Sequence, residues 1–265
     1  MAVKRQRRKP VVLTIAGSDN SAGAGVQADL KTFSYFGCYG LTAITCVVAE
    51  VPGEVSAIQP VWSEVVGEQI ALSLDAFPVA AVKTGLLFST AIVEIVAEKL
   101  AMTSVKLVVD PVMVASSGDQ LLKKSAVAAY RKLLFPMATL VTPNLDELRV
   151  LTGRKVRNLP EMKDAGRALV EKYGSAFLLK GGHLRGKFAV DYLATRAGIE
   201  EFAAPFVKGV QTHGTGCTYA AAVTANLAKG LNLHEAVFEA KAYITAAISK
   251  RLTWGSTSAL EHFPD

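Results

Sequence analysis

The sequence has few of the features that would mark a secreted, zinc-stabilised or membrane protein. It contains three cysteines in 265 residues, without Cys-x-x-Cys spacing, and this odd count suits reduced thiols better than a disulfide framework. The apolar run at residues 11–16 is too short for the core of a signal peptide, and no run of about 20 uncharged apolar residues follows it. We therefore expect a cytoplasmic protein with no structural zinc and no membrane partner.

Most of the chain also lacks an excess of charge of one sign. The formal net charge is +6, but five basic residues lie close to the start of the chain, at Lys4, Arg5, Arg7, Arg8 and Lys9. A short basic run of this kind is usually a solvated tail. We expect residues 1–10 to form a disordered basic tail, and the nearly neutral remainder does not indicate a nucleic-acid partner.

Neither an internal repeat nor a Pro/Ser-rich linker divides residues 11–265, which are predicted to form a single domain. Short runs rich in Val, Ile and Leu alternate there with segments of helical periodicity. The runs lie at residues 11–16, 41–49, 79–82, 105–109, 138–141 and 176–180, and the helical segments at 26–36, 65–77, 90–101, 125–134, 145–151, 161–173, 215–229 and 233–252. This alternation predicts an α/β fold with a mostly parallel central sheet flanked by helices on both faces.

Residues 188–195 and 201–206 break the alternation, because they read as two strands joined by a turn at 196–198. They predict an antiparallel hairpin at one edge of the sheet. In open α/β sheets, ligands bind at the carboxyl ends of the strands, and the candidate functional residues below all follow a predicted strand or begin a helix.

The small, polar segment 17–25 lies between the first predicted strand and the first predicted helix. Glycines let a backbone approach a ligand, and Asp19 and Asn20 can hydrogen-bond locally to hold the loop, so we interpret it as substrate-facing, with a flexible connector as the alternative. Gly23 to Ala28 also satisfies the Gly-x-Gly-x-x-Gly/Ala dinucleotide pattern, with Glu50 in place of the ribose-binding acid. That alternative is disfavoured because polar residues separate Gly23 from the strand.

Lys180 ends a predicted strand and precedes two glycines, where its ammonium could reach a phosphate; an ordinary strand-end lysine is the alternative. The following segment, Gly181 to Phe188, resembles a P-loop. However, Phe188 stands where Ser or Thr would bind Mg²⁺, and a strand pattern follows instead of a helix.

Asn144 and Glu147 lie three residues apart at a predicted helix start, as capping residues or as oxygen ligands of hydrated Mg²⁺. Asp110 ends a further predicted strand at the same edge of the sheet. These three residues are candidate magnesium ligands, although their spacing alone is weak evidence.

The segment His213-Gly214-Thr215-Gly216-Cys217-Thr218 begins a predicted helix rich in small residues. Free N–H groups and the helix dipole at such a start favour an anion, including a phosphoryl group during its transfer. The same position favours the thiolate of Cys217, which makes it a candidate base toward a substrate hydroxyl. The alternative is a small residue that packs the helix. Cys38 and Cys46 lack this setting and are expected in the core.

Together these motifs resemble the hydroxymethylpyrimidine/phosphomethylpyrimidine kinases of thiamine biosynthesis, within the ribokinase-like superfamily. The resemblance spans nearly the whole chain. It rests on Thr14-Ile15-Ala16-Gly17-Ser18-Asp19, Ala24-Gly25-Val26-Gln27-Ala28-Asp29-Leu30-Lys31-Thr32-Phe33, Asp110-Pro111-Val112-Met113, Thr142-Pro143-Asn144, Lys180-Gly181-Gly182-His183 and His213-Gly214-Thr215-Gly216-Cys217-Thr218.

The resemblance implies a ribokinase-like fold, a homodimer, and phosphorylation by MgATP of hydroxymethylpyrimidine and of its monophosphate. It implies that Gly214, Thr215, Gly216, Cys217 and Lys180 are catalytic, with Cys217 as the base. It assigns the substrate pocket to Gly17, Asp19, Ala24, Glu50, Leu86, Val112 and Cys217. ATP contacts are assigned to Thr142, Asn144, Lys180, Gly182, Gly214, Gly216 and Lys241, and Mg²⁺ to Asp110, Asn144 and Glu147.

Two pocket positions depart from the family pattern. Leu86 replaces a usual methionine, which changes shape modestly. Glu50 stands where these kinases carry glutamine, and a carboxylate only accepts hydrogen bonds. A neutral aminopyrimidine therefore requires an extra proton on Glu50 or on the ring, unless the substrate presents two donors.

The departure at Glu50 leaves other substrates open. The related pyridoxal kinases also depart at this position, so a vitamin B6 kinase is an alternative, although Thr215 favours the pyrimidine branch. A pyrimidine-binding sensor that has lost phosphoryl transfer is the non-enzymatic alternative.

Overall fold

The computed structural model describes residues 9–113, 122, 124–182, 184, 186–207 and 213–264. Residues 1–8 of the predicted basic tail lie outside this part of the chain. So do His183 and Arg185 of the motifs discussed above.

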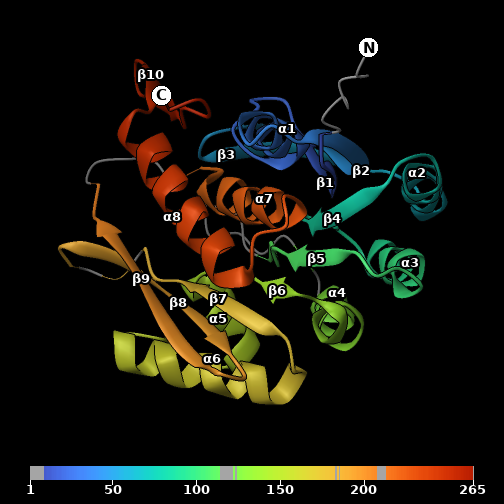
Figure 1. The fold of residues 1–265 in the computed structure, drawn as a ribbon. Helices are drawn as coiled ribbons and strands as arrows, with labels where there is room; N and C mark the ends of the chain where they lie inside the picture. Colours follow the sequence, from blue (N-terminus) through green and yellow to red (C-terminus); the bar gives the residue numbers. More distant parts are fainter. Residues whose placement is uncertain are drawn as a thin grey trace, which may run out of the picture.

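Strands from both ends of the described chain form one nine-stranded sheet, with the order β3-β2-β1-β4-β5-β6-β7-β8-β9 (Figure 1). The strands of this sheet are β1 (Val11–Asp19), β2 (Tyr39–Val51), β3 (Glu54–Pro60), β4 (Val79–Thr84), β5 (Lys106–Val109), β6 (Leu140–Val141), β7 (Ala176–Lys180), β8 (Phe188–Thr195) and β9 (Gly198–Pro205). The strands from β2 across to β7 pair in parallel. The predicted, mostly parallel sheet is therefore confirmed.

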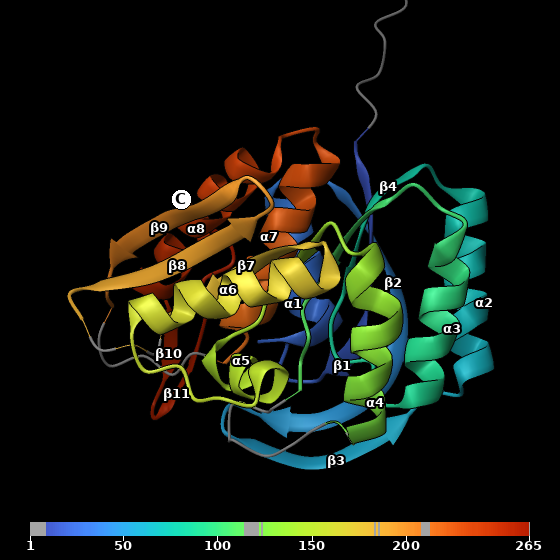
Figure 2. The ribbon, with the colours of Figure 1, turned by 90° about the horizontal axis from the view of Figure 1, so that it is seen from below.

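Helices cover both faces of this sheet, as predicted. One face carries α1 (Gly25–Tyr35), α7 (Thr215–Ala228) and α8 (Leu233–Ser249), whose small and aromatic residues pack on the strands. The other carries α2 (Ser63–Ala76), α3 (Thr90–Ala101), α4 (Lys124–Ala129), α5 (Leu145–Thr152) and α6 (Leu159–Tyr173), over the larger apolar cluster. Figure 2 shows α2, α3 and α4 side by side on that second face.

The predicted edge hairpin is confirmed as β8 and β9, which pair antiparallel around Arg196 and Ala197. Phe188 begins β8, so the segment that resembles a P-loop leads into a strand and not into a helix. A second antiparallel edge strand, β3, was not predicted. It follows a turn at Gly53, whose φ of +94° favours glycine, and its side chains are mostly exposed, which hides the apolar alternation of a strand.

Two predicted helices end earlier than their periodicity indicated. The segment 125–134 is α-helical only to Ala129 and continues as a π-helical turn, Tyr130–Leu134, and a short 3₁₀ turn, Phe135–Met137, that contains Pro136. The last helix stops at Ser249, because β10 (Leu252–Trp254) turns back at Gly255 to pair with β11 (Thr257–Ala259).

Candidate active site

A cavity of about 570 Å³ opens where the carboxyl ends of the parallel strands meet the first turns of α1 and α7. Its walls contain all but one of the predicted site residues. These are Gly17, Asp19, Ala24, Glu50, Leu86, Asp110, Val112, Asn144, Glu147, Lys180, Gly182, Gly214, Thr215, Gly216, Cys217 and Lys241. The exception is Thr142, which is buried behind the wall and donates a hydrogen bond to Asp110 Oδ1 at 2.8 Å.

Asp19 holds the loop between β1 and α1 in shape. Its carboxylate accepts hydrogen bonds from the backbone N–H of Ser21 (2.7 Å) and of Ala24 (2.8 Å), as the predicted local bonding requires. Burial alone would raise the pKa of Asp19, but these bonds and one from His213 lower it to about 2. Asn20 does not bond locally: its Oδ1 accepts from the backbone N–H of Glu50 on β2 (2.7 Å) and ties the loop to the next strand.

Glu50 is half-buried at one end of this cavity, beside the Asp19 and His213 pair. His213 Nε2 lies 3.1 Å from Asp19 Oδ2, and ligand-type atoms of Asp19, Glu50 and His213 all lie within 4.8 Å of one another. Burial and Asp19 raise the pKa of Glu50, with His213 opposing. The hydrogen bond with Asp19 in turn raises the pKa of His213. Asp19 already accepts from two backbone N–H groups and lies within hydrogen-bond distance of His213.

The start of α7 faces the middle of the cavity. Gly214 adopts φ +76°, and a Cβ built on it would lie 1.7 Å from the carbonyl oxygen of Gly23, so only glycine fits. A Cβ on Gly216 would lie 3.1 Å from Lys180 Nζ, which places the lysine ammonium beside the helix start. The Thr215 hydroxyl oxygen is buried here and has no partner among the described residues. This turn therefore combines free donors with a cation, as an anion site requires.

Cys217 lies in the first turn of α7, but the predicted stabilisation of its thiolate is wrong for this structure. Burial raises the pKa of the thiol to about 12, although Lys83 and the backbone N–H of Gly25 lower it. The loss of solvent contributes more than these two lowering effects together. All three cysteines are free, as predicted, and Cys38 and Cys46 are buried.

Lys180 and two carboxylates form the polar side of the cavity opposite Glu50. Lys180 Nζ lies 2.9 Å from Asp110 Oδ1, and Lys180 and Lys83 lower the pKa of Asp110 although burial opposes this. Burial raises the pKa of Glu147 to about 8, with Asp110 adding to the effect and Lys180 opposing it. A cation close to such a buried carboxylate stabilises its ionised form.

Asn144 caps α5. Its Oδ1 accepts from the Glu147 backbone N–H (2.9 Å), and Glu147 Oε2 accepts from the Asn144 backbone N–H (2.8 Å). The structure thus shows a capping box, in which the Asn144 amide oxygen and the Glu147 carboxylate each already accept a hydrogen bond.

Two buried ion pairs, one in the cavity wall and one behind it, were not predicted from the sequence. Asp191 on β8 accepts from Lys241 Nζ (2.7 Å) and from the backbone N–H of Gly181 (2.9 Å), so it joins α8 to the loop after Lys180. Lys83 on β4 donates to both carboxylate oxygens of Asp29 on α1, at 2.8 and 2.9 Å, with neither side chain exposed. In the sequence, these Asp and Lys residues occur singly within strand and helix patterns, which do not indicate that they pair.

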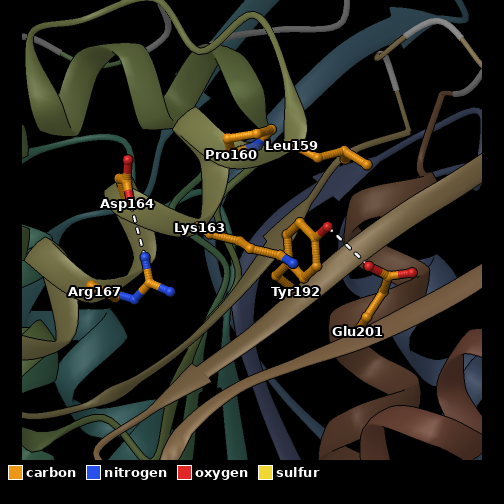
Figure 3. Close-up of a pocket in the computed structure, with 7 residues that line it drawn as sticks. All are labelled: Leu159, Pro160, Lys163, Asp164, Arg167, Tyr192 and Glu201. Atoms are coloured by element: carbon orange, nitrogen blue, oxygen red, sulfur yellow. Dashed lines mark hydrogen bonds and ion pairs between the residues drawn. The ribbon is translucent and has the colours of Figure 1, made fainter.

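A second pocket, of about 420 Å³, lies between α6 and strands β8 and β9 (Figure 3). Its charged groups are occupied by each other: Arg167 pairs with Asp164 at 2.8 Å, Tyr192 donates to Glu201 at 3.0 Å, and Lys163 lies 4.7 Å from the centre of the Tyr192 ring. It lies apart from the sheet edge that carries the candidate residues. We therefore place the chemistry in the larger cavity.

A mostly parallel sheet covered on both faces, with an anion-binding helix start beside a lysine and two carboxylates, defines a ribokinase-like small-molecule kinase fold. Within that class, the chain belongs to the phosphomethylpyrimidine kinase family, whose family model matches residues 19–261.

The chain is 43% identical over 240 residues to the hydroxymethylpyrimidine/phosphomethylpyrimidine kinase of Rhizobium meliloti, covering 90% of each protein. It is also 43% identical to a thiamine biosynthesis bifunctional protein of Geobacter sulfurreducens, of which it spans only 52%.

Two solved structures show the same fold. One is a phosphomethylpyrimidine kinase from Clostridium difficile, with a TM-score of 0.80 and 39% identity, covering 91% of this chain and 100% of that one. The other is the ADP complex of Bacillus subtilis pyridoxal kinase, with a TM-score of 0.90 and 36% identity, covering 97% and 98%.

Proposed function

We propose that this protein is an ATP-dependent kinase that phosphorylates the hydroxymethyl group of hydroxymethylpyrimidine and then its monophosphate, two steps of thiamine biosynthesis. The observation that carries the proposal is that one cavity joins two unlike regions. Glu50, Leu86 and Val112, two of them apolar, line the same cavity as the anion-binding start of α7. The family relatives named above support the same reaction.

The side chains divide the work of phosphoryl transfer between them. The N–H groups from Gly214 to Gly216 face the charge that develops on the transferred group, and Lys180 supplies a cation beside them. Cys217 lies in the same turn and is proposed to accept the proton of the substrate hydroxyl. Because its pKa is raised to about 12, that role relies on Lys83, the charged side chain that favours the thiolate.

Asp110 and Glu147 are proposed to hold Mg²⁺. Their carboxylate oxygens are hard donors of the kind that this ion prefers, and burial, which raises the pKa of Glu147 to about 8, makes a bound cation favourable there. When bound, Mg²⁺ neutralises part of the charge on the ATP phosphates. Lys241, fixed by Asp191, and Gly182 line the remaining wall and are proposed to contact the nucleotide.

Pyridoxal kinase activity is a second candidate, because the Bacillus subtilis pyridoxal kinase superposes with a TM-score of 0.90. The two activities are separated by offering hydroxymethylpyrimidine, its monophosphate, pyridoxal, pyridoxine and pyridoxamine singly with MgATP, while ADP release and product mass are recorded. Turnover of the two pyrimidines supports the proposal. Turnover of the B6 vitamers alone supports the second candidate, and binding without ADP release indicates a sensor.

We further infer that two copies of the chain form a homodimer through the exposed surface of the β2 and β3 hairpin, part of which, at Val51 and Val55, also lines the cavity. Val47, Val51 and Val55 lie on this hairpin with 52%, 50% and 37% of their surfaces exposed. An edge hairpin that exposes this much apolar surface tends to aggregate unless a partner covers it. Light scattering should give twice the chain mass, and Val47→Asp should shift the mass toward that of one chain. A wild-type monomer at micromolar concentration contradicts the inference.

A further inference from the structure

The position of Glu50 poses a hydrogen-bonding problem that the structure makes specific. The side chain lines the ring-sized end of the cavity, close to the apolar groups of Val48 and Leu86. Among the described residues, none donates a hydrogen bond to its carboxylate. Its backbone N–H is held by Asn20, so the strand cannot easily turn the side chain away. A ligand in this end of the cavity must therefore satisfy the carboxyl group itself.

An aminopyrimidine offers one donor and one acceptor side by side, namely the exocyclic amine and a ring nitrogen. An ionised carboxylate has only acceptors, so it can meet the amine but would set a lone pair against the ring nitrogen. One added proton resolves this conflict. If it lies on the carboxyl, the O–H donates to the ring nitrogen; if it lies on the ring, the N–H donates to the carboxylate. Both arrangements contain the same atoms and the same two hydrogen bonds.

We propose that Glu50 recognises the pyrimidine through a pair of hydrogen bonds that contains one shared proton, so that substrate binding takes up this proton from solvent. The proposal rests on the proposed function and names how the same site selects its ring. A substrate that offers the ring nitrogen and the amine together satisfies both oxygens of Glu50. A ring without the adjacent amine satisfies only one.

The groups around Glu50 favour this arrangement. Asp19, at the end of β1, is ionised and lies within 4.8 Å, so a second negative charge on Glu50 is disfavoured. His213, which precedes α7, donates to Asp19 at 3.1 Å. Its charge is therefore engaged by Asp19 and does not serve Glu50 alone. On β2, burial raises the pKa of the Cys46 thiol to about 11, so it stays neutral. On β3, Glu54 is exposed and solvent-screened.

Proton uptake on binding measures this directly. Hydroxymethylpyrimidine is titrated calorimetrically at pH 8 in phosphate and in Tris, buffers with different ionisation enthalpies, for the wild type, Glu50→Gln and Glu98→Gln. Glu98, on α3, is a matched control because it also loses one carboxylate, and its side chain is 67% exposed away from the cavity. We expect uptake of about one proton by the wild type and by Glu98→Gln, and about none by Glu50→Gln.

The same difference should appear in turnover. Above pH 7, kcat/KM of the wild type relative to Glu50→Gln should fall by about tenfold per pH unit. Each added pH unit lowers about tenfold the fraction of free Glu50 or free pyrimidine that carries the shared proton. Because Glu50 also raises the pKa of His213, the same ratio is measured in a His213→Gln background, where His213 cannot titrate. If wild type and Glu50→Gln take up equal numbers of protons and have parallel pH profiles, the inference is overturned. If hydroxymethylpyrimidine is still phosphorylated in that case, the proposed function stands. Failure to bind or phosphorylate hydroxymethylpyrimidine overturns both.

Discussion

Replacement of Gly214 by alanine tests whether the start of α7 is held against the substrate loop as tightly as the structure shows. The new Cβ would lie 1.7 Å from the carbonyl oxygen of Gly23, whereas real Cβ contacts essentially never fall below 3.0 Å. The loop and the helix start must therefore separate by about 1.3 Å, the difference between these two distances. Such a shift moves the N–H groups of the proposed anion site away from the phosphoryl group.

Two costs of Gly214→Ala can be separated. The left-handed conformation, with φ +76°, costs an alanine roughly 1–2 kcal/mol of folding free energy. The displacement itself should lower kcat by about 100-fold, since misplacement of catalytic groups by 1 Å has an effect of that order. Gly255→Ala is the matched control: φ is +59° there, but the space around its Cβ is open and the site is remote. It should lose stability by a similar amount and keep wild-type kcat.

The assay couples ADP release to absorbance at saturating MgATP and hydroxymethylpyrimidine, with urea unfolding of the same preparations. Wild-type kcat in Gly214→Ala would refute the assignment of this turn to phosphoryl transfer. Equal losses of kcat in Gly214→Ala and Gly255→Ala would show that the effect comes from reduced stability alone.

Three further predictions concern the charged and nucleophilic groups around the cavity. Cys217→Ser should lower kcat by about 100-fold or more while ATP affinity, measured by calorimetry, is retained; equal turnover would remove the role of Cys217 as base. Lys83→Met leaves Asp29 buried without a counter-charge, with the Thr14 hydroxyl as its remaining donor among the described side chains, and should cost about 3–5 kcal/mol of unfolding free energy in urea. Most of this loss should be recovered in Lys83→Met/Asp29→Asn, and a loss below about 1 kcal/mol would contradict the prediction. The pKa of Asp19 is lowered from 3.8 to about 2, so it stabilises the fold above pH 4 and this contribution is lost as the pH falls through 2. On acidification, Asp19→Asn should therefore lose roughly 2 kcal/mol less unfolding free energy than the wild type does. The same pH dependence of unfolding free energy in both proteins would contradict the lowered pKa of Asp19.

The features that the sequence predicted well are those controlled by local patterns. The parallel strands, the hairpin of β8 and β9, and the start of α7 follow from apolar periodicity and glycine placement, and the cavity collects the predicted residues because strand ends meet at one edge of a sheet. Strands β3 and β10 were missed since their side chains are mostly exposed and do not alternate, and β11 because its three residues are too few to show a period.

The electrostatics of the site could not be read from local patterns. The His213 and Asp19 pair joins residues 194 positions apart, and the Lys83 and Asp29 pair joins β4 to α1. Cys217 shows the same limit: its place at a helix start is visible in the sequence, but the burial that raises its pKa to about 12 comes from the packing of other elements. Glu50 could be recognised as a departure, whereas its charged neighbours required the fold.

The measurement that tests the central claim most directly is a competition experiment. Equimolar hydroxymethylpyrimidine and pyridoxal are incubated with limiting MgATP, and the ratio of the two phosphorylated products by mass spectrometry gives the ratio of their kcat/KM values. The account predicts that phosphorylated hydroxymethylpyrimidine predominates at neutral pH. Predominance of pyridoxal 5′-phosphate would contradict it.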